Sequence, residues 1–196
     1  VARRAGGRDI RQIVIGNEGA LCFITEVTMK LFPYLPQNNR YIAYKLDDSQ
    51  MKLGFDCLRE VMVNGYRPSF ARLYDAADAQ QHFSAWLEPD KAILIWMAEG
   101  AEGITKATYE GIKELMSKHP ELEPVETDLI EKWYLGLNWG PENIAQEMEE
   151  IKATKNIGIT TEVSGCWDCI YEIYKTSCER IANEVPDITM IGGHSS

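Results

Sequence analysis

The sequence lacks three features that would assign it to common classes of protein. No apolar run approaches the ~20 residues of a transmembrane helix, and the first residues contain no apolar core of a signal peptide. No continuous run of Lys and Arg occurs, and the formal net charge is -10. Nucleic acids and anionic membranes are bound through clustered positive charge, so neither partner is expected. We expect a protein without a transmembrane segment, located in the cytoplasm.

The sequence is also poor in groups for metal or hydrolytic chemistry. Cys166 and Cys169 form a C-x-x-C motif, but no second such pair and no H-x-x-x-H motif completes a zinc site. A thioredoxin-like pair is the alternative, although Trp167 between the cysteines belongs to an apolar helical stripe. Five cysteines without a secretory signal indicate free thiols, so we expect no metal site and no disulfide framework. His82 and His119 lack neighbouring nucleophiles or ligands, and we interpret both as surface residues at helix ends.

The chain is organised around residues 13–32, IVIGNEGALCFITEVTMKLF. A short apolar run leads into a turn between Gly16 and Gly19, and an alternating run typical of a β-strand follows at residues 22–31. Glycine is favoured where the backbone must turn tightly or approach another group closely. The pattern predicts strand, glycine turn and strand, which by itself is common in any protein that contains β-structure.

Prolines at positions 33 and 36 bracket a short linker, and we place a domain boundary there, between residues 1–36 and 37–196. The chain begins at Val1 and ends directly after an expected strand at residues 188–191. We therefore expect it to be part of a longer protein.

Hydrophobic periodicity after the linker predicts an α+β domain. Two β-α-β units in succession predict a ferredoxin-like antiparallel sheet with helices on one face, preceded by the short strand segment described above. A third helix follows from Ser164. The expected strands are residues 40–46, 68–75, 92–97, 124–129, 157–163 and 187–191, and the expected helices include 48–63, 78–83, 104–115 and the interrupted stretch 131–151.

The segment from Asp9 to Pro33 resembles the end of the FAD-binding domain of FAD-linked oxidases. This family of vanillyl-alcohol-oxidase-like flavoproteins includes D-lactate dehydrogenases, glycolate oxidases and alkyldihydroxyacetonephosphate synthases. The sequence departs from the family pattern at Cys22, usually glycine, and at Asn17, usually serine. The resemblance implies flavin contacts, mostly through backbone groups, at Glu18, Gly19, Ala20, Leu21, Cys22, Phe23 and Ile24.

Later motifs resemble the cap domain of the same family, especially its alkyldihydroxyacetonephosphate synthase branch. One such motif is PSFARLYD at residues 68–75, and the resemblance implies that Arg72 corresponds to an arginine that matters for activity in this branch. The alternative is that Arg72 forms a salt bridge with Asp75 or Asp78. In EKWYL at residues 131–135, Lys132 stands where the branch has a substrate-binding arginine. A lysine keeps the positive charge but cannot form the two parallel hydrogen bonds that an arginine makes with a phosphate. His194 lies where the family enters its active-site strand.

The resemblance implies a fragment of an FAD-dependent oxidoreductase whose cap shapes the pocket for an anionic 2-hydroxy acid. Arg72 and His194 are the expected catalytic residues, and Arg72 and Lys132 the expected substrate ligands. An alkyldihydroxyacetonephosphate synthase-like enzyme and a non-catalytic ferredoxin-like binding module are the alternatives. The expected partners are a small anionic substrate, the rest of the FAD domain and a possible second copy in a homodimer. The fragment alone is expected to bind FAD weakly or not at all.

Overall fold

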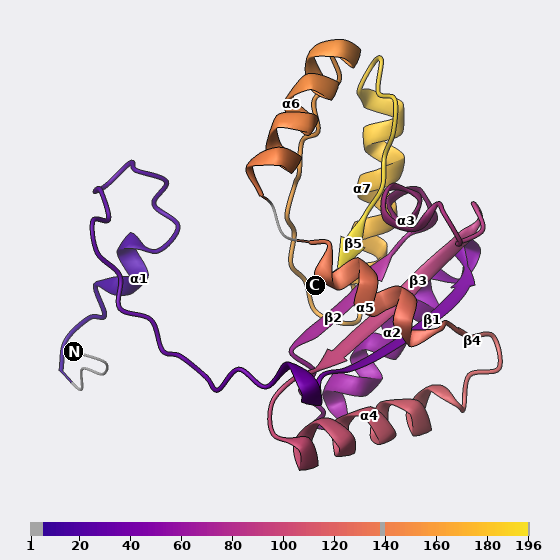
Figure 1. The fold of residues 1–196 in the computed structure, drawn as a ribbon. Helices are drawn as coiled ribbons and strands as arrows, with labels where there is room; N and C mark the ends of the chain where they lie inside the picture. The colour runs from indigo at the N-terminus through magenta and orange to yellow at the C-terminus, as the bar shows by residue number, and fades with distance from the viewer. Residues whose placement is uncertain (1–5, 138–139, 196) are drawn as a thin grey trace. The chain divides into compact units, whose positions relative to one another are not determined.

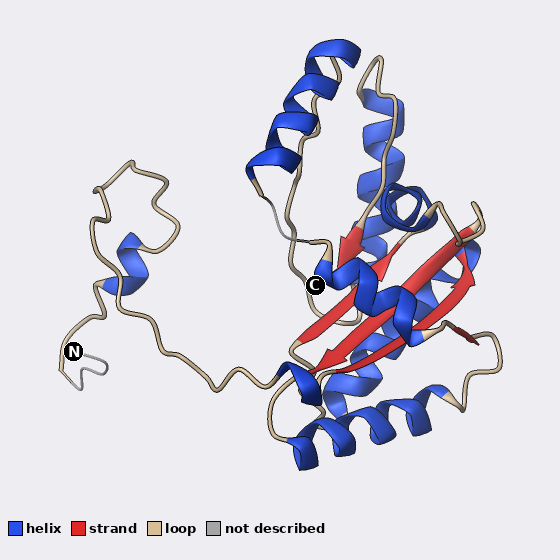
Figure 2. Ribbon diagram, in the orientation of Figure 1, coloured by secondary structure: helices blue, strands red, loops and turns tan. Residues whose placement is uncertain are grey.

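The computed structural model describes residues 6–137 and 140–195, and it divides into two compact units, Val1–Pro33 and Tyr34–Ser196 (Figures 1 and 2). The division falls three residues before the boundary expected from the prolines, and the assignment of the units to two domains stays a prediction.

The described part of the first unit contains one short helix, α1 (Arg11–Val14), followed by a turn and an extended chain. The strand–turn–strand prediction for residues 13–32 is wrong in this structure. A strand needs a neighbour that satisfies its N–H and C=O groups, and none of the described segments pairs with residues 22–31.

The second unit is built on a five-stranded antiparallel sheet of order β4-β1-β3-β2-β5. Its first four strands have the order and direction of a ferredoxin-like sheet, so the predicted α+β class and antiparallel sheet are confirmed. The short β5 extends the edge beside β2 (Figure 1). The strands are β1 (Arg40–Asp47), β2 (Phe70–Tyr74), β3 (Lys91–Ala98), β4 (Glu123–Pro124) and β5 (His194–Ser195).

Helices cover both faces of this sheet. Helices α2 (Met51–Val63) and α4 (Glu102–Met116) lie on one face, where their apolar sides pack on Leu94 and Trp96 of β3. Helices α3 (Ala76–Phe83) and α5 (Thr127–Leu135) lie on the other, against Ile93 and Ile95. The second layer goes beyond the expected single layer of helices. Its presence explains why every residue from 92 to 98 is buried in the central strand β3.

Three expected strands differ in the structure. Residues 124–129 contribute only the end of β4, because Ile130, Trp133 and Tyr134 recur at helical spacing and fold this segment into α5. Residues 157–163 and 187–191 form neither helix nor strand, and β5 begins instead at His194.

The remaining helices follow the predicted helical tendencies. The interrupted stretch divides into α5 and α6 (Pro141–Thr154), and Trp139 of the expected interruption lies outside the described residues. The acidic residues of α6 are exposed, as expected for a solvated helix face. The third helix, α7 (Ile170–Glu184), starts later than expected, and two short 3-10 helices are η1 (Pro36–Asn38) and η2 (Asp48–Gln50).

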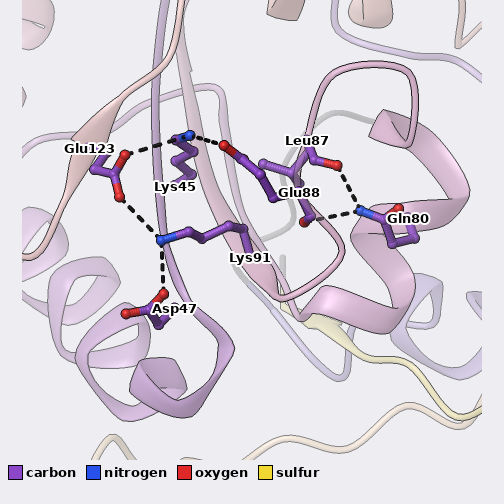
Figure 3. A network of polar contacts seen from close by, with 7 residues as sticks. All are labelled: Lys45, Asp47, Gln80, Leu87, Glu88, Lys91 and Glu123. Atoms are coloured by element: carbon purple, nitrogen blue, oxygen red, sulfur yellow. Dashed lines mark hydrogen bonds and ion pairs between the residues drawn. The ribbon is translucent and has the colours of Figure 1, made fainter.

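A polar network closes one end of the sheet (Figure 3). Its members are Lys45, Asp47, Gln80, Leu87, Glu88, Lys91 and Glu123. The Nζ of Lys45 lies 2.7 Å from Glu88 and 3.5 Å from Glu123, while that of Lys91 lies 2.8 Å from Asp47 and 3.1 Å from Glu123. The alternating charges connect β1, β3 and the short edge strand β4, which has few backbone hydrogen bonds of its own.

The packing of α2 on the sheet makes a testable prediction at Gly54. A Cβ there would lie 2.7 Å from Leu73 Cδ2, and Leu73 is fully buried in β2. Gly103 in α4 is the matched control, since nothing lies within 4 Å of its Cβ position. Both changes to alanine gain helix propensity, so Gly54→Ala should lower the free energy of unfolding by about 1–3 kcal/mol relative to Gly103→Ala. Urea denaturation of both variants measures this difference, and equal stabilities would contradict the packing.

Candidate functional site

The candidate site lies on the sheet face covered by α3 and α5. Side chains alternate along β2, so Phe70, Arg72 and Tyr74 lie on this same face. Trp133 of α5 packs over them, with its ring centroid 5.6 Å from Phe70 and 6.1 Å from Tyr74. Aromatic rings therefore lie around the side chain of Arg72.

Arg72 has polar contacts, but none of them is with a carboxylate of the residues that the structure describes. Its Nη1 donates a hydrogen bond of 2.8 Å to the Tyr74 hydroxyl, and its guanidinium carbon lies 5.1 Å from the centroid of Phe70. The Nε is buried without a hydrogen-bond partner, and no ion pair joins Arg72 to any residue in the described ranges. The expected alternative, a salt bridge to Asp75 or Asp78, is therefore wrong. A buried N–H without a partner is unusual and suits a site for a ligand acceptor.

His194 reaches the same site from the far end of the chain. Strand β5 pairs with β2 so that His194 lies opposite Tyr74, and the two rings are 5.1 Å apart. The His194 Nδ1 lies 2.8 Å from Oδ2 of Asp78, which faces it from α3. The structure thus brings both expected catalytic residues, Arg72 and His194, to one tyrosine ring.

A second imidazole, His82, lies beside this group at the end of α3, and its side chain is 36% exposed, which agrees with the expected surface position. Its Nε2 lies 4.0 Å from Oδ1 of Asp78, and its ring is 5.3 Å from Tyr74. Burial lowers the pKa of His82, as do the nearby His194 and Arg72, while the carboxylate of Asp78 opposes this shift. The four-residue spacing of Asp78 and His82 on one helix was the available sequence signal.

Tyr74 is the centre of the site. Burial raises the pKa of its hydroxyl, and the hydrogen bond from Arg72 partly opposes that shift. The hydroxyl therefore keeps its proton at neutral pH and can itself donate to a ligand.

Lys132 lies on α5, next to Trp133, but its side chain is exposed. Within the part of the chain that the structure describes, the Lys132 side chain forms no hydrogen bond or ion pair with Arg72 or with another residue. Its role as a substrate ligand stays a prediction.

The expected flavin-contact residues Glu18, Gly19, Ala20, Leu21, Cys22, Phe23 and Ile24 lie in the turn of the first unit. The turn uses left-handed backbone at Gly16 (φ 74°), Glu18 (φ 48°) and Gly19 (φ 81°). Oδ1 of Asn17 accepts hydrogen bonds of 3.3 Å from the N–H groups of Leu21 and Cys22. Cys22 does not have a positive φ, so its backbone does not require the usual glycine.

No cluster of three or more metal-ligating side chains occurs among residues 6–137 and 140–195. Cys166 and Cys169 are exposed free thiols, and Sγ of Cys169 donates to the carbonyl of Cys166 at 3.3 Å. None of the helices in the described chain is both long and apolar enough to span a membrane.

The partial desolvation of His82, whose side chain is 36% exposed, lowers its pKa and predicts a small pH dependence of stability. The folded protein favours its neutral form, so the unfolded chain binds a proton first as the pH falls below the ordinary histidine pKa of about 6.5. His82 thus contributes stability that is lost on acidification. Between about pH 7.5 and about pH 5.5, the thermal midpoint should fall less in His82→Gln than in the unsubstituted protein. Thermal unfolding followed by circular dichroism measures both midpoints. An equal fall of the thermal midpoint in both proteins would contradict the lowered pKa of His82.

Known proteins support the expected family. No family model matches the sequence. The uncharacterized FAD-linked oxidoreductase YgcU of Escherichia coli, in strains O157:H7 and K12, is 56% identical to this chain over 199 residues. This match covers 100% of the chain and 40% of each relative. The alkyldihydroxyacetonephosphate synthase of Caenorhabditis elegans is 30% identical over 135 residues, which are 62% of this chain and 22% of the synthase.

These matches agree with the motifs of the glycine turn and of the site on β2. The chain therefore belongs to the FAD-linked oxidoreductase family, as a segment that spans 40% of the length of its Escherichia coli relatives.

Proposed function

We propose that this chain is the segment of an FAD-dependent oxidoreductase that carries the end of the flavin-binding domain and most of a cap domain over the substrate. The substrate class is a small anionic 2-hydroxy acid, oxidised by hydride transfer to the flavin. The observation that carries the proposal is Arg72, a partly buried cation with a free Nε and no carboxylate partner among the described residues. Such a cation suits an anionic ligand, in a chain whose net charge is -10.

The residues of the first unit fit a flavin contact through the backbone. A Cβ placed at Gly16 or Gly19 would meet nothing within 4 Å, so the turn is open to an external group. The turn and the following residues 22–24 line a shallow depression. Glu18, Gly19, Ala20, Leu21, Cys22, Phe23 and Ile24 would hold the cofactor, which supplies a two-electron acceptor when bound.

The second unit would bind and orient the substrate. Arg72 holds the carboxylate of the 2-hydroxy acid, and the exposed Lys132 adds positive charge at the rim. His194 accepts the proton of the 2-hydroxyl, because Asp78 at 2.8 Å holds its Nδ1 and stabilises the imidazolium that forms. The flavin, when bound, would supply the acceptor for the hydride of the substrate, while the residues of this chain would hold the carboxylate and take up the hydroxyl proton. Phe70 and Trp133 exclude water from the guanidinium.

The proposal includes the rest of the FAD domain as a partner of the first unit. Large apolar side chains are exposed there, among them Phe23 at 91% and Leu31 at 86%. Many exposed large apolar side chains within one short segment are typical of a segment that another part of the protein covers. A homodimer and a cytoplasmic location, which the free cysteines suit, are further parts of the proposal.

An alkyldihydroxyacetonephosphate synthase-like activity is the second candidate, favoured by the similarity to the Caenorhabditis elegans synthase. Its phosphate-ester substrate would also need a cation. Lys132 in the arginine position weakens this candidate, since lysine cannot bind phosphate through two parallel hydrogen bonds.

Substitution of Arg72 tests the substrate site. In the full-length protein, Arg72→Ala should lower kcat/KM by roughly 10- to 150-fold, because charge-assisted hydrogen bonds contribute about 1.5–3 kcal/mol. The assay compares D-lactate, glycolate and acyl-dihydroxyacetonephosphate, and the substrate that is turned over decides between the two candidates. Arg59→Ala, at an exposed position of α2, is the control. Unchanged turnover in Arg72→Ala would make Arg72 a structural residue.

Flavin content tests the division of the cofactor site. The full-length protein should purify with about one FAD per chain, measured by absorbance after denaturation, whereas residues 1–196 alone should retain little or none. A stoichiometric yellow complex of the fragment would contradict the domain boundary. Absence of flavin from the full-length protein would favour a non-catalytic ferredoxin-like module.

A further inference from the structure

Asp75, between β2 and α3, is a buried carboxylate that the mechanism above does not use. It is 4% exposed and accepts three hydrogen bonds. Its Oδ1 accepts from the N–H of Asp78 at 2.9 Å, which caps the N-terminus of α3. Its Oδ2 accepts from the Tyr174 hydroxyl and from the N–H of Gly193, both at 2.7 Å. One side chain therefore connects β2, α3, α7 and the residue before His194.

The backbone reinforces this connection. The N–H of Asp75 donates to the carbonyl of Gly193 at 3.0 Å, so the two residues are bonded in both directions. A Cβ at Gly192 would lie 2.8 Å from the Asp78 nitrogen, and a Cβ at Gly193 would lie 2.7 Å from Cε2 of Tyr174. Both glycines are thus required by close approach. We call Asp75, Tyr174, Gly192 and Gly193 the glycine latch.

The latch determines where His194 lies. Strand β5 has only two residues, and residues 185–191 before it form neither helix nor strand. The His194 side chain is 38% exposed, so burial alone holds it weakly. The bonds of Gly193 to Asp75 fix the backbone one residue earlier, and this places the imidazole on Tyr74 and Asp78.

Tyr174 is suited to be a permanent donor in the latch. Burial and the neighbouring carboxylate raise the pKa of its hydroxyl, which therefore keeps its proton at neutral pH. Its ring packs on Phe55 of α2, with centroids 5.8 Å apart. The hydroxyl is thus held in place by the core on the opposite face of the sheet from His194.

We propose that Asp75 and Tyr174 are positioning residues for the proton transfer by His194, acting through Gly193. The proposal rests on the proposed function for its kinetic consequence, whereas the ordering of residues 192–195 follows from the latch alone. Neither side chain contacts the substrate. Loss of the latch should therefore affect the step that uses His194 more than the binding that uses Arg72.

The experiment compares Tyr174→Phe with Tyr171→Phe in the full-length flavoprotein. Tyr171 lies on the same helix and packs on the same Phe55, with centroids 6.0 Å apart, but its hydroxyl bonds to no described residue. Tyr174→Phe should lower kcat by roughly tenfold and change KM less than about twofold, and Tyr171→Phe should change neither. Arg72→Lys should show the opposite result, with a larger change in KM than in kcat.

Hydrogen exchange gives a readout that does not depend on turnover. Backbone amides of residues 192–195 should exchange roughly tenfold faster in Tyr174→Phe than in Tyr171→Phe, because Asp75 loses a donor that holds it in place. Asp75→Asn, which keeps one acceptor oxygen, should fall between Asp75→Ala and the unsubstituted protein. Unchanged exchange and unchanged kcat in Tyr174→Phe would overturn the proposal. Faster exchange in a protein without any flavin-dependent turnover would retain the latch and reject the proposed function.

Discussion

The structure of the second unit depends on the burial of β3 on both faces. Seven successive residues of this strand, from 92 to 98, are buried, so each face needs its own helical layer. The strands β1 and β2 flank β3, and side chains of both belong to the apolar clusters on the two faces of the sheet. On β2 this places the alternating Phe70, Arg72 and Tyr74 under α3 and α5, where a charged group is costly unless it is paired.

Arg72 is therefore the residue that stability alone does not explain. Aromatic rings at 5.1 and 5.9 Å and the Tyr74 hydroxyl provide partial compensation through cation–π contact and a hydrogen bond. A hydrophobic side chain of similar volume would satisfy the packing at lower cost. A guanidinium without a carboxylate partner among the described residues is consistent with a site that a ligand anion completes, and the family membership agrees with that interpretation.

Local sequence patterns predicted much of the fold. They failed where the formation of a strand depends on a neighbouring strand that pairs with it. The strands around residues 40–46, 68–75 and 92–97 were predicted because alternation or a continuous apolar run marks them directly. Residues 22–31 alternate equally well, yet they form no strand because no described segment pairs with them. Residues 127–135 carry a helical stripe that a strand prediction for 124–129 overlooked.

By itself, the sequence determined the elements with strong periodicity, the turn between Gly16 and Gly19, and, through resemblance, the candidates Arg72 and His194. Only the tertiary structure decided which residues meet. Gly193 is 118 residues from Asp75, and Tyr174 is 99 residues from it. His194 lies at the site because β5 pairs with β2. Local propensity is a property of neighbouring residues, whereas these contacts depend on the order of strands in the sheet, which no short pattern contains.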